Sequence, residues 1–204
     1  MSIVVKKLLI ISILTLFQTS PSPKVILFYG DSLTAGYGLS TEEAFPALIE
    51  KRLIQKGKAI KVVNAGLSGE TSAGGLNRLD WILKQPVDIF VLELGANDGL
   101  RGLPLDQTQK NLQGIIDKVA AKYPNAKIVI AGMLVPPNMG PDYTASFRKI
   151  FPEIAKKNKA TLIPFLLQGV AGDEKLNIAD GIHPNVEGHK IVAENVLKVI
   201  EPLL

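Results

Sequence analysis

The stretch KVILFYGDSLT, residues 24–34, decides the fold of this chain. Residues 24–29 form an apolar run without polar alternation, which predicts a strand buried on both faces. Gly30 follows directly, and Asp31 and Ser32 then stand where the strand should end. Strands of this kind occur in parallel sheets that helices cover on both sides, so the stretch predicts an α/β fold.

Short apolar runs alternate with longer amphipathic segments along the rest of the chain. Further strands are expected at residues 58–63, 87–94, 127–133 and 161–165. Helices are expected at residues 42–55, 71–84, 105–122, 143–158 and 186–203. Ser40 and Glu43 are placed for a capping box at the first of these helices. The alternation predicts a parallel sheet whose strands are joined by right-handed crossovers.

The composition describes one ordinary globular domain. The chain has 204 residues, of which 47% are hydrophobic and 21% charged, enough for a single packed core. It contains no cysteine, which excludes disulfides, thiolate metal sites and a cysteine nucleophile. Its two histidines are His183 and His189, so a multi-histidine metal centre is disfavoured and a histidine base has two candidates. No metal or organic cofactor is expected.

Residues 1–22 have the pattern of a secretory signal peptide. Lys6 and Lys7 precede an apolar run over residues 8–17, which small and turn-forming residues follow. The run is about half as long as the roughly 20 residues that a membrane span needs, although an uncleaved N-terminal anchor stays an alternative. The sequence therefore predicts a domain at residues 23–204 that is periplasmic or secreted, with no stable membrane span after cleavage.

Removal of the leader also changes the interpretation of the charge. The net charge falls from +4 to +2, because both leader lysines leave with it. The remaining basic residues are scattered among acidic ones and do not alternate with aromatic residues, so no nucleic-acid partner is expected. The expected partner is a small ester or lipid-like substrate, and the expected state is a monomer.

The segments that follow the predicted strands are rich in glycine and small polar residues. They are residues 30–34, 64–71, 95–99, 132–142 and 180–184. The carboxyl ends of parallel strands meet at one edge of a sheet, where ligands of α/β proteins bind. These segments are therefore expected to form a single site.

Acyl transfer is the chemistry that these residues suggest. Ser32 is the candidate nucleophile, and His183 the base that accepts its proton. Asp180 lies three residues before His183, a spacing that in one turn brings the carboxylate to one ring nitrogen and leaves the other facing the serine. Candidate oxyanion donors are the backbone N–H groups of Ser32 and Gly69 and the side-chain amide of Asn97.

Four motifs resemble a known family. GDSLTAGYG (30–38), NAGLSGETS (64–72), ELGANDGLRG (93–102) and DGIHPN (180–185) look like blocks I, II, III and V of the SGNH (GDSL) hydrolases, in their order. The similarity is strongest to bacterial arylesterases and multifunctional acyl-CoA thioesterase/lysophospholipase members. It implies a three-layer α/β/α sandwich of flavodoxin type with five parallel strands. It also implies the catalytic set Ser32, Asp180 and His183, with Ser32, Gly69 and Asn97 as oxyanion hole and no cofactor.

Other interpretations of the chain were weighed against this one. The α/β-hydrolase elbow G-x-S-x-G is excluded, because Thr34 and Glu70 stand where its last glycine should be. A carbohydrate O-acetyl esterase would use the same chemistry, and an inactive binding module on this fold is the alternative of another class. The first interpretation is a serine esterase that acts on aryl esters, acyl-CoA or lysophospholipid-like substrates through an acyl-serine intermediate.

Single residues also have structural interpretations. Ser32 could cap a helix, and Asp180 is expected to form an Asx turn in addition to its catalytic role. His189 is interpreted as a surface or packing histidine. A metal site of Asp180, His183 and Glu187 is disfavoured, because it contains one histidine and no third strong ligand.

Two further carboxyl groups have different interpretations: Asp31 lies next to Ser32 and could tune the site, whereas Glu93 is assigned no catalytic role. Asp31 is expected to accept hydrogen bonds from nearby backbone N–H groups. Glu93 lies within an apolar strand, so it should be hydrogen-bonded or neutral if it is buried.

The loops beside the site carry apolar residues. Leu103, Leu134, Val135 and Met139 are expected to line a groove for an acyl chain or an aryl group. Ordinary loop packing is the alternative for all four.

Overall fold

Five parallel strands form the centre of the structure, a computed structural model that describes residues 22–204. Residues 1–21 lie outside this range, so the signal-peptide prediction is not tested. The strands are β1 (Lys24–Gly30), β2 (Ile60–Gly66), β3 (Ile89–Glu93), β4 (Lys127–Ala131) and β5 (Thr161–Ile163). Their spatial order is β2-β1-β3-β4-β5 with every pairing parallel, which confirms the predicted fold class.

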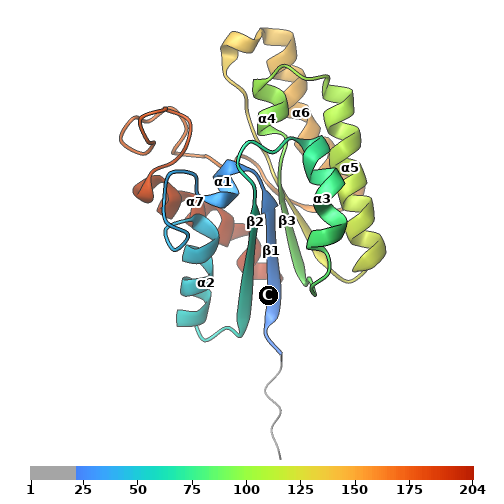
Figure 1. Ribbon diagram of the computed structural model, residues 1–204, viewed down its shortest axis with the longest axis vertical. Helices are drawn as coiled ribbons and strands as arrows, with labels where there is room; N and C mark the ends of the chain where they lie inside the picture. Colours follow the sequence, from blue (N-terminus) through green and yellow to red (C-terminus); the bar gives the residue numbers. More distant parts are fainter. Residues whose placement is uncertain (1–21) are drawn as a thin grey trace, which may run out of the picture.

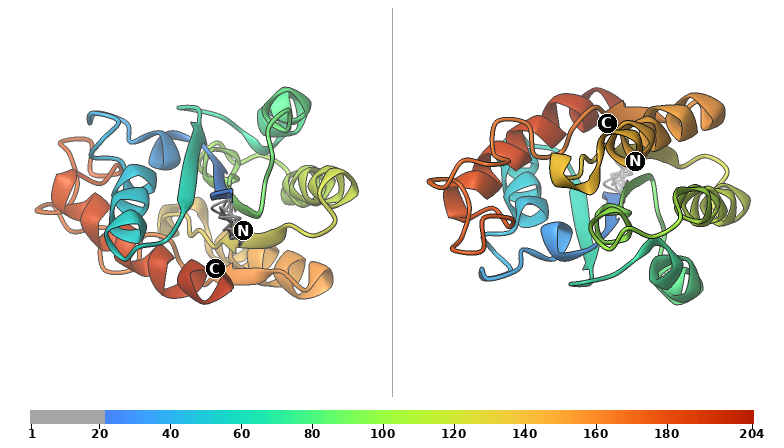
Figure 2. Two further views of the ribbon diagram at one scale, coloured as in Figure 1. Left: turned by 90° about the horizontal axis from the view of Figure 1, so that it is seen from below. Right: turned by 90° about the horizontal axis from the view of Figure 1, so that it is seen from above.

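Helices cover both faces of the sheet. The α-helices are α1 (Ser32–Ala35), α2 (Phe45–Gln55), α3 (Ser72–Ile82), α4 (Ala96–Leu100), α5 (Leu105–Lys122), α6 (Pro141–Asn158) and α7 (Val186–Ile200). Helix α2 packs beside α7 on one face, and α3, α5 and α6 pack on the other (Figure 2). None of the helices within residues 22–204 combines the length and the apolar character needed to cross a membrane.

The sheet is buried on both faces, as its apolar strands predict. Ile26, Leu27, Phe28 and Tyr29 of β1 are fully buried, and so is the whole of β3. Each large apolar side chain that is removed from water in this way contributes about 1.5–3 kcal/mol. The central strands β1 and β3 therefore form a rigid base for the segments at their carboxyl ends.

The strand order reverses between β1 and β3. The chain moves from β1 to β2 in one direction and then returns past β1 to β3. In open parallel sheets, ligands bind outside the carboxyl ends at such a switch point. The short helices α1 and α4 lie at this edge, at the upper side of the molecule in Figure 1. Ser32 is in α1 and Asn97 is in α4.

Several predicted boundaries differ from the structure. Strand β2 extends to Gly66 and does not end at residue 63, because it pairs with β1 up to Gly30. Helix α2 begins at Phe45, next to Pro46, and not at residue 42. Ser40 and Glu43 are hydrogen-bonded, but in the turn that precedes the helix and not as a capping box: the Ser40 N–H and hydroxyl both donate to the Glu43 carboxylate. Helices α1 and α4 were not predicted because four or five residues are too few to show a period.

The remaining differences are shifts of an element's end. Strands β3, β4 and β5 stop at residues 93, 131 and 163, before the loops that the prediction had included. Helix α3 spans Ser72–Ile82, and α6 begins two residues early, at Pro141. Helix α7 ends at Ile200, where a 3₁₀ turn that contains Pro202 replaces the last predicted residues.

Candidate active site

Ser32, His183 and Asp180 are joined by hydrogen bonds. His183 Nε2 lies 2.8 Å from Ser32 Oγ, and His183 Nδ1 lies 2.6 Å from Asp180 Oδ2. Ser32 and His183 are 151 residues apart in sequence. The structure thus brings the three predicted residues together, with the histidine between the serine and the carboxylate.

The Asp180 side chain also shapes the turn that carries His183. Its Oδ1 accepts hydrogen bonds from the backbone N–H groups of Ile182 (2.9 Å) and His183 (3.0 Å), as expected for an Asx turn. Gly181, between Asp180 and Ile182, has a φ of +70°, which favours glycine. Desolvation raises the pKa of Asp180, but the hydrogen bonds from His183 and from the Ile182 N–H outweigh it and lower the pKa to about 2, so the side chain is a carboxylate at neutral pH.

An exposed aromatic ring covers one face of the histidine. The Tyr37 and His183 ring centroids are 4.6 Å apart, and the rings are inclined by 42°. Tyr37 comes from the turn that follows α1, so the segment that carries Ser32 also holds the imidazole in place. This contact was not predicted, because the two residues lie far apart in the sequence.

Gly69 lies in the loop between β2 and α3. Its φ of +78° favours glycine, and its carbonyl accepts a hydrogen bond of 2.9 Å from Arg101 Nη2. Within residues 22–204 neither the Gly69 nor the Ser32 backbone N–H has an acceptor among the hydrogen bonds of the structure. Both groups are therefore free to donate to a substrate.

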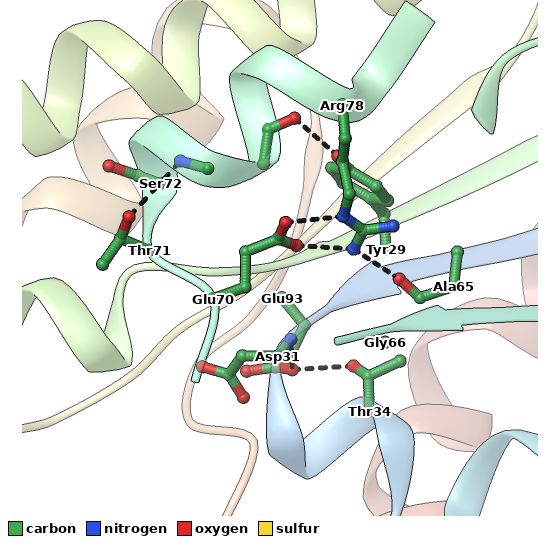
Figure 3. A network of polar contacts seen from close by, with 12 residues as sticks. Tyr29, Asp31, Thr34, Ala65, Gly66, Glu70, Thr71, Ser72, Arg78 and Glu93 are labelled. Atoms are coloured by element: carbon green, nitrogen blue, oxygen red, sulfur yellow. Dashed lines mark hydrogen bonds and ion pairs between the residues drawn. The ribbon is translucent and has the colours of Figure 1, made fainter. Parts of the chain in front are cut away.

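A partly buried ion pair fixes the end of the same loop. Glu70 and Arg78 form a two-pronged contact, and Arg78 Nη2 also donates to the Ala65 carbonyl at 2.7 Å (Figure 3). The Arg78 guanidinium lies 4.4 Å from the centre of the Tyr29 ring. Helix α3 and strands β1 and β2 thus hold the residue next to Gly69.

The third candidate oxyanion donor, Asn97, lies across the switch point from Ser32. Its Nδ2 donates to Asp31 Oδ2 over 3.0 Å. Asp31 Oδ1 accepts from the Leu33 N–H at 3.0 Å and so caps α1, which confirms the expected local backbone contact. Asp31 therefore connects α1, which carries Ser32, to α4, which carries Asn97.

Glu93 lies beneath Asp31 and is fully buried. Its Oε2 accepts from Thr34 Oγ1 at 2.7 Å and from the Asp31 N–H at 3.2 Å, and Figure 3 shows the three side chains together. Burial, with the nearby Asp31 charge, raises the pKa of Glu93 well above its usual value. Glu93 is thus hydrogen-bonded, and its raised pKa favours the neutral acid, in line with the expectation for a buried glutamate.

The four predicted groove residues differ in exposure. Leu103 and Leu134 are 36% and 40% exposed. Met139 is partly buried, and its Cε faces Gly102. Val135 is buried against Gly99 and is the least exposed of the four. In the extended segment after β4 the side chains alternate, which turns Leu134 outward and Val135 into the core.

Glu187 is not part of the site. Its carboxylate pairs with Lys190 at 2.6 Å. Across the part of the chain that the structure describes, no three histidine, cysteine, aspartate or glutamate side chains lie together as metal ligands would. The metal interpretation thus gains no support from Glu187.

His189 is a packing residue and not a surface residue. It is 1% exposed, its ring stacks on Phe45, and its Nδ1 accepts the Phe45 N–H at 3.1 Å. The bond satisfies a free donor at the start of α2, and it requires that Nδ1 carry no proton. Burial, assisted by the charge of His183 and opposed by Glu43, lowers the pKa of His189 to about 4.

Acid should therefore destabilise the protein through His189. Its pKa is about 4 in the folded chain and about 6.5 when unfolded, so the unfolded chain binds more protons between these values. The free energy of unfolding is expected to fall by up to about 3 kcal/mol as the pH drops through this window. Urea unfolding at several pH values will measure this. A His189→Asn variant should show a flatter dependence, and an unchanged dependence would contradict the assignment.

Comparison with known proteins places these features in a family. The model of the GDSL-like Lipase/Acylhydrolase family matches residues 28–191. Esterase TesA of Pseudomonas aeruginosa is 41% identical over 192 residues, which are 94% of each chain. Thioesterase 1/protease 1/lysophospholipase L1 of Escherichia coli K12 is 39% identical over 180 residues, 88% of this chain and 84% of that protein.

A solved structure gives the same result. The crystal structure of TesA superposes with a TM-score of 0.84 at 42% identity, and the match covers 89% of this chain and all of that one. The family match includes Ser32, Asp180 and His183. The four sequence motifs, the fold and these relatives agree, and the chain belongs to the GDSL-like lipase/acylhydrolase family, as its resemblance to the SGNH hydrolases predicted.

Proposed function

We propose that this esterase hydrolyses carboxylic esters and thioesters by acyl transfer to Ser32. The observation that carries the proposal is the continuous path from Asp180 through both ring nitrogens of His183 to Ser32 Oγ. A serine hydroxyl becomes an effective nucleophile when an adjacent base takes its proton, and the carboxylate holds that base in the required tautomer.

The reaction follows from this geometry in two halves. His183 Nε2 takes the hydroxyl proton as Ser32 Oγ attacks the carbonyl carbon, and the carbonyl oxygen becomes an oxyanion. Collapse of this intermediate breaks the bond to the alcohol or thiol, which leaves with the proton from His183. Water then attacks the acyl-serine with His183 again as base, and the acid and free Ser32 are released.

Three donors are available to the oxyanion. They are the free backbone N–H groups of Ser32 and Gly69 and the Asn97 amide. Donors that are already in place when the charge develops are worth about 10²–10³ each in kcat. The substrates named for the relatives, esters, thioesters and lysophospholipids, share an acyl carbonyl that this mechanism can use.

The test is a panel of initial rates. It should run from acetyl to palmitoyl aryl esters and include acyl-CoA, lysophospholipid and an acetylated sugar. Turnover of aryl esters and of at least one acyl-CoA or lysophospholipid is expected. Activity confined to the acetylated sugar would replace this proposal with a carbohydrate esterase.

An apolar rim surrounds the site, and we infer that it receives the acyl chain or aryl group. Of eight exposed large hydrophobic side chains within residues 22–204, six lie in segments at the carboxyl edge of the sheet. This rim consists of Tyr37, Leu67, Leu100, Leu103, Leu134 and Ile182. The other two, Ile54 and Trp81, lie near the carboxyl ends of α2 and α3, which run back toward the opposite edge.

Polar substitutions in the rim should therefore affect long acyl chains selectively. In the double variant Leu103→Ser/Leu134→Ser, kcat/KM for an octanoyl aryl ester should fall about 10-fold, because less apolar contact is made with the chain. The value for the acetyl ester should change less than about 2-fold. The matched control, Ile54→Ser/Trp81→Ser, should change neither. An equal loss for both esters would assign the two leucines to loop packing.

We also propose that the chain is exported. The support is the sequence pattern of residues 1–22, two lysines followed by an apolar run. N-terminal sequencing of the protein from a periplasmic fraction should find a start near residue 23. A mature protein that begins at residue 1 in the cytosolic fraction would contradict this.

A further inference from the structure

Two carboxyl groups are buried together beneath the nucleophile. Asp31 is 1% exposed and Glu93 is 0% exposed. Asp31 directly follows β1, and Glu93 is the last residue of β3, the strand that pairs with β1. Neither forms an ion pair with a basic residue of the described chain. Two adjacent buried carboxyl groups do not both ionise, because burial and mutual repulsion oppose the second charge. Maintaining such a pair costs stability, and this suggests a role in the site.

The contacts show which of the two carries the negative charge. Asp31 accepts two hydrogen bonds, from the Leu33 N–H and from Asn97 Nδ2, one on each oxygen. Glu93 Oε2 accepts two, while its Oε1 has no partner among residues 22–204 and is the place for a proton. Burial raises the pKa of Asp31 to about 6, and that of Glu93 is also strongly raised. The hydrogen bonds therefore assign the negative charge to Asp31 and the proton to Glu93.

The carboxylate decides how the Asn97 amide is oriented. An ionised carboxylate can only accept hydrogen bonds, so the NH₂ group of Asn97 and not its oxygen must face Asp31. That NH₂ group has two N–H bonds about 120° apart, and Asp31 uses one of them. Asn97 is only partly buried, so its second N–H is available at the mouth of the site. Without the carboxylate, the amide could turn its oxygen toward the oxyanion and repel it.

We propose that Asp31 is a positioning residue that acts through Asn97: it fixes the amide so that one N–H is always presented to the developing oxyanion. This rests on the proposed acyl-transfer function. The same side chain caps α1, so it aligns the helix of the nucleophile and the side-chain donor from opposite sides of the switch point. Glu93 Oε2 accepts hydrogen bonds from the Asp31 backbone N–H and the Thr34 hydroxyl, and so keeps the start of α1 in place.

The variant Asp31→Asn separates this role from a structural one. An asparagine offers one oxygen where Leu33 and Asn97 together require two acceptors, so one contact is lost. We expect kcat to fall about 10- to 100-fold, with KM changed less than about 3-fold, because the oxyanion contact forms in the transition state. The control is Asp173→Asn, which alters an Asx contact of the same spacing (to the Lys175 N–H, 2.9 Å) away from the site and should leave both constants unchanged.

A double-mutant cycle then tests the route through Asn97. The single variant Asn97→Ala should lose about 10²–10³ in kcat. Asp31→Asn/Asn97→Ala should lose no more than about 3-fold beyond Asn97→Ala, because no amide is left to orient and the asparagine oxygen can still accept the Leu33 N–H. Losses that multiply would overturn the proposal while leaving the esterase function intact. A wild-type protein without esterase activity would instead overturn the proposed function.

A measurement on the wild-type protein covers the case in which Asp31→Asn does not fold. The side-chain amide of Asn97, identified in NMR spectra by its loss in Asn97→Ala, should show one downfield, slowly exchanging Hδ2 proton at pH 7.5, because that proton is bonded to a buried carboxylate. Two Hδ2 protons that exchange like those of a free amide would overturn the proposal.

Discussion

Replacing Ser32 with alanine is expected to lower kcat at least about 10⁴-fold. Alanine keeps the backbone N–H that faces the oxyanion but has no Oγ to attack the carbonyl, so no acyl-enzyme can form. The residual rate should reflect only substrate binding and the remaining oxyanion donors. Initial rates on the best aryl ester of the panel will measure the loss. A serine-directed phosphonate should add its mass to the wild-type protein but not to the variant.

The variant should remain folded. Only the hydrogen bond to His183 is lost, which costs about 1 kcal/mol and lowers the melting temperature by roughly 2–4 °C. Ser68→Ala is the matched control, because Ser68 is an exposed serine in the neighbouring loop and should tolerate the change. Near-normal turnover by Ser32→Ala, or phosphonate labelling of Ser68, would identify a different nucleophile.

The sequence could predict the fold because its signals are local and long. The apolar run at residues 24–29 and the amphipathic pattern over the 18 residues of α5 are each long enough to define an element. Helix α5 was predicted with the correct bounds. The ends of the other predicted helices and strands were less accurate. The end of β2 depends on Gly66, where a Cβ would lie 2.2 Å from the Ala35 nitrogen, and such a close contact is visible only in three dimensions.

The candidate site could be predicted as a set of residues but not as a network. Ser32, Asp180 and His183 stand in motifs after strands, so the topology alone implies that they meet. The link from Asp31 to Asn97 joins residues 66 apart, and nothing in either motif indicates it. Tyr37 on His183 and His189 on Phe45 were missed for the same reason. The different exposure of Leu134 and Val135 could not be predicted either, because their alternation depends on the extended path of the loop.

Replacing Asp180 with asparagine is expected to lower kcat by about 10⁴-fold near pH 7 while the loop keeps its shape. The backbone N–H groups of Ile182 and His183 both donate to Oδ1, so the single amide oxygen of the variant must stay in that position. Its NH₂ group then faces His183 Nδ1, which lies 2.6 Å from Oδ2 in the wild-type protein. An NH₂ group donates, so Nδ1 is forced to accept.

The consequence appears at the other ring nitrogen. A neutral imidazole that accepts at Nδ1 carries its proton on Nε2, and that nitrogen, 2.8 Å from Ser32 Oγ, can no longer take the serine proton. The loop itself is held by contacts that do not involve Asp180, among them the Ile178 N–H bond to the His183 carbonyl at 2.8 Å. Rates, melting temperatures and phosphonate labelling of the variant should therefore show a folded protein whose serine reacts slowly. If Asp180→Asn kept more than about a tenth of wild-type kcat, the carboxylate would not be needed to set the tautomer of His183, and the order of proton transfer proposed for this site would be wrong.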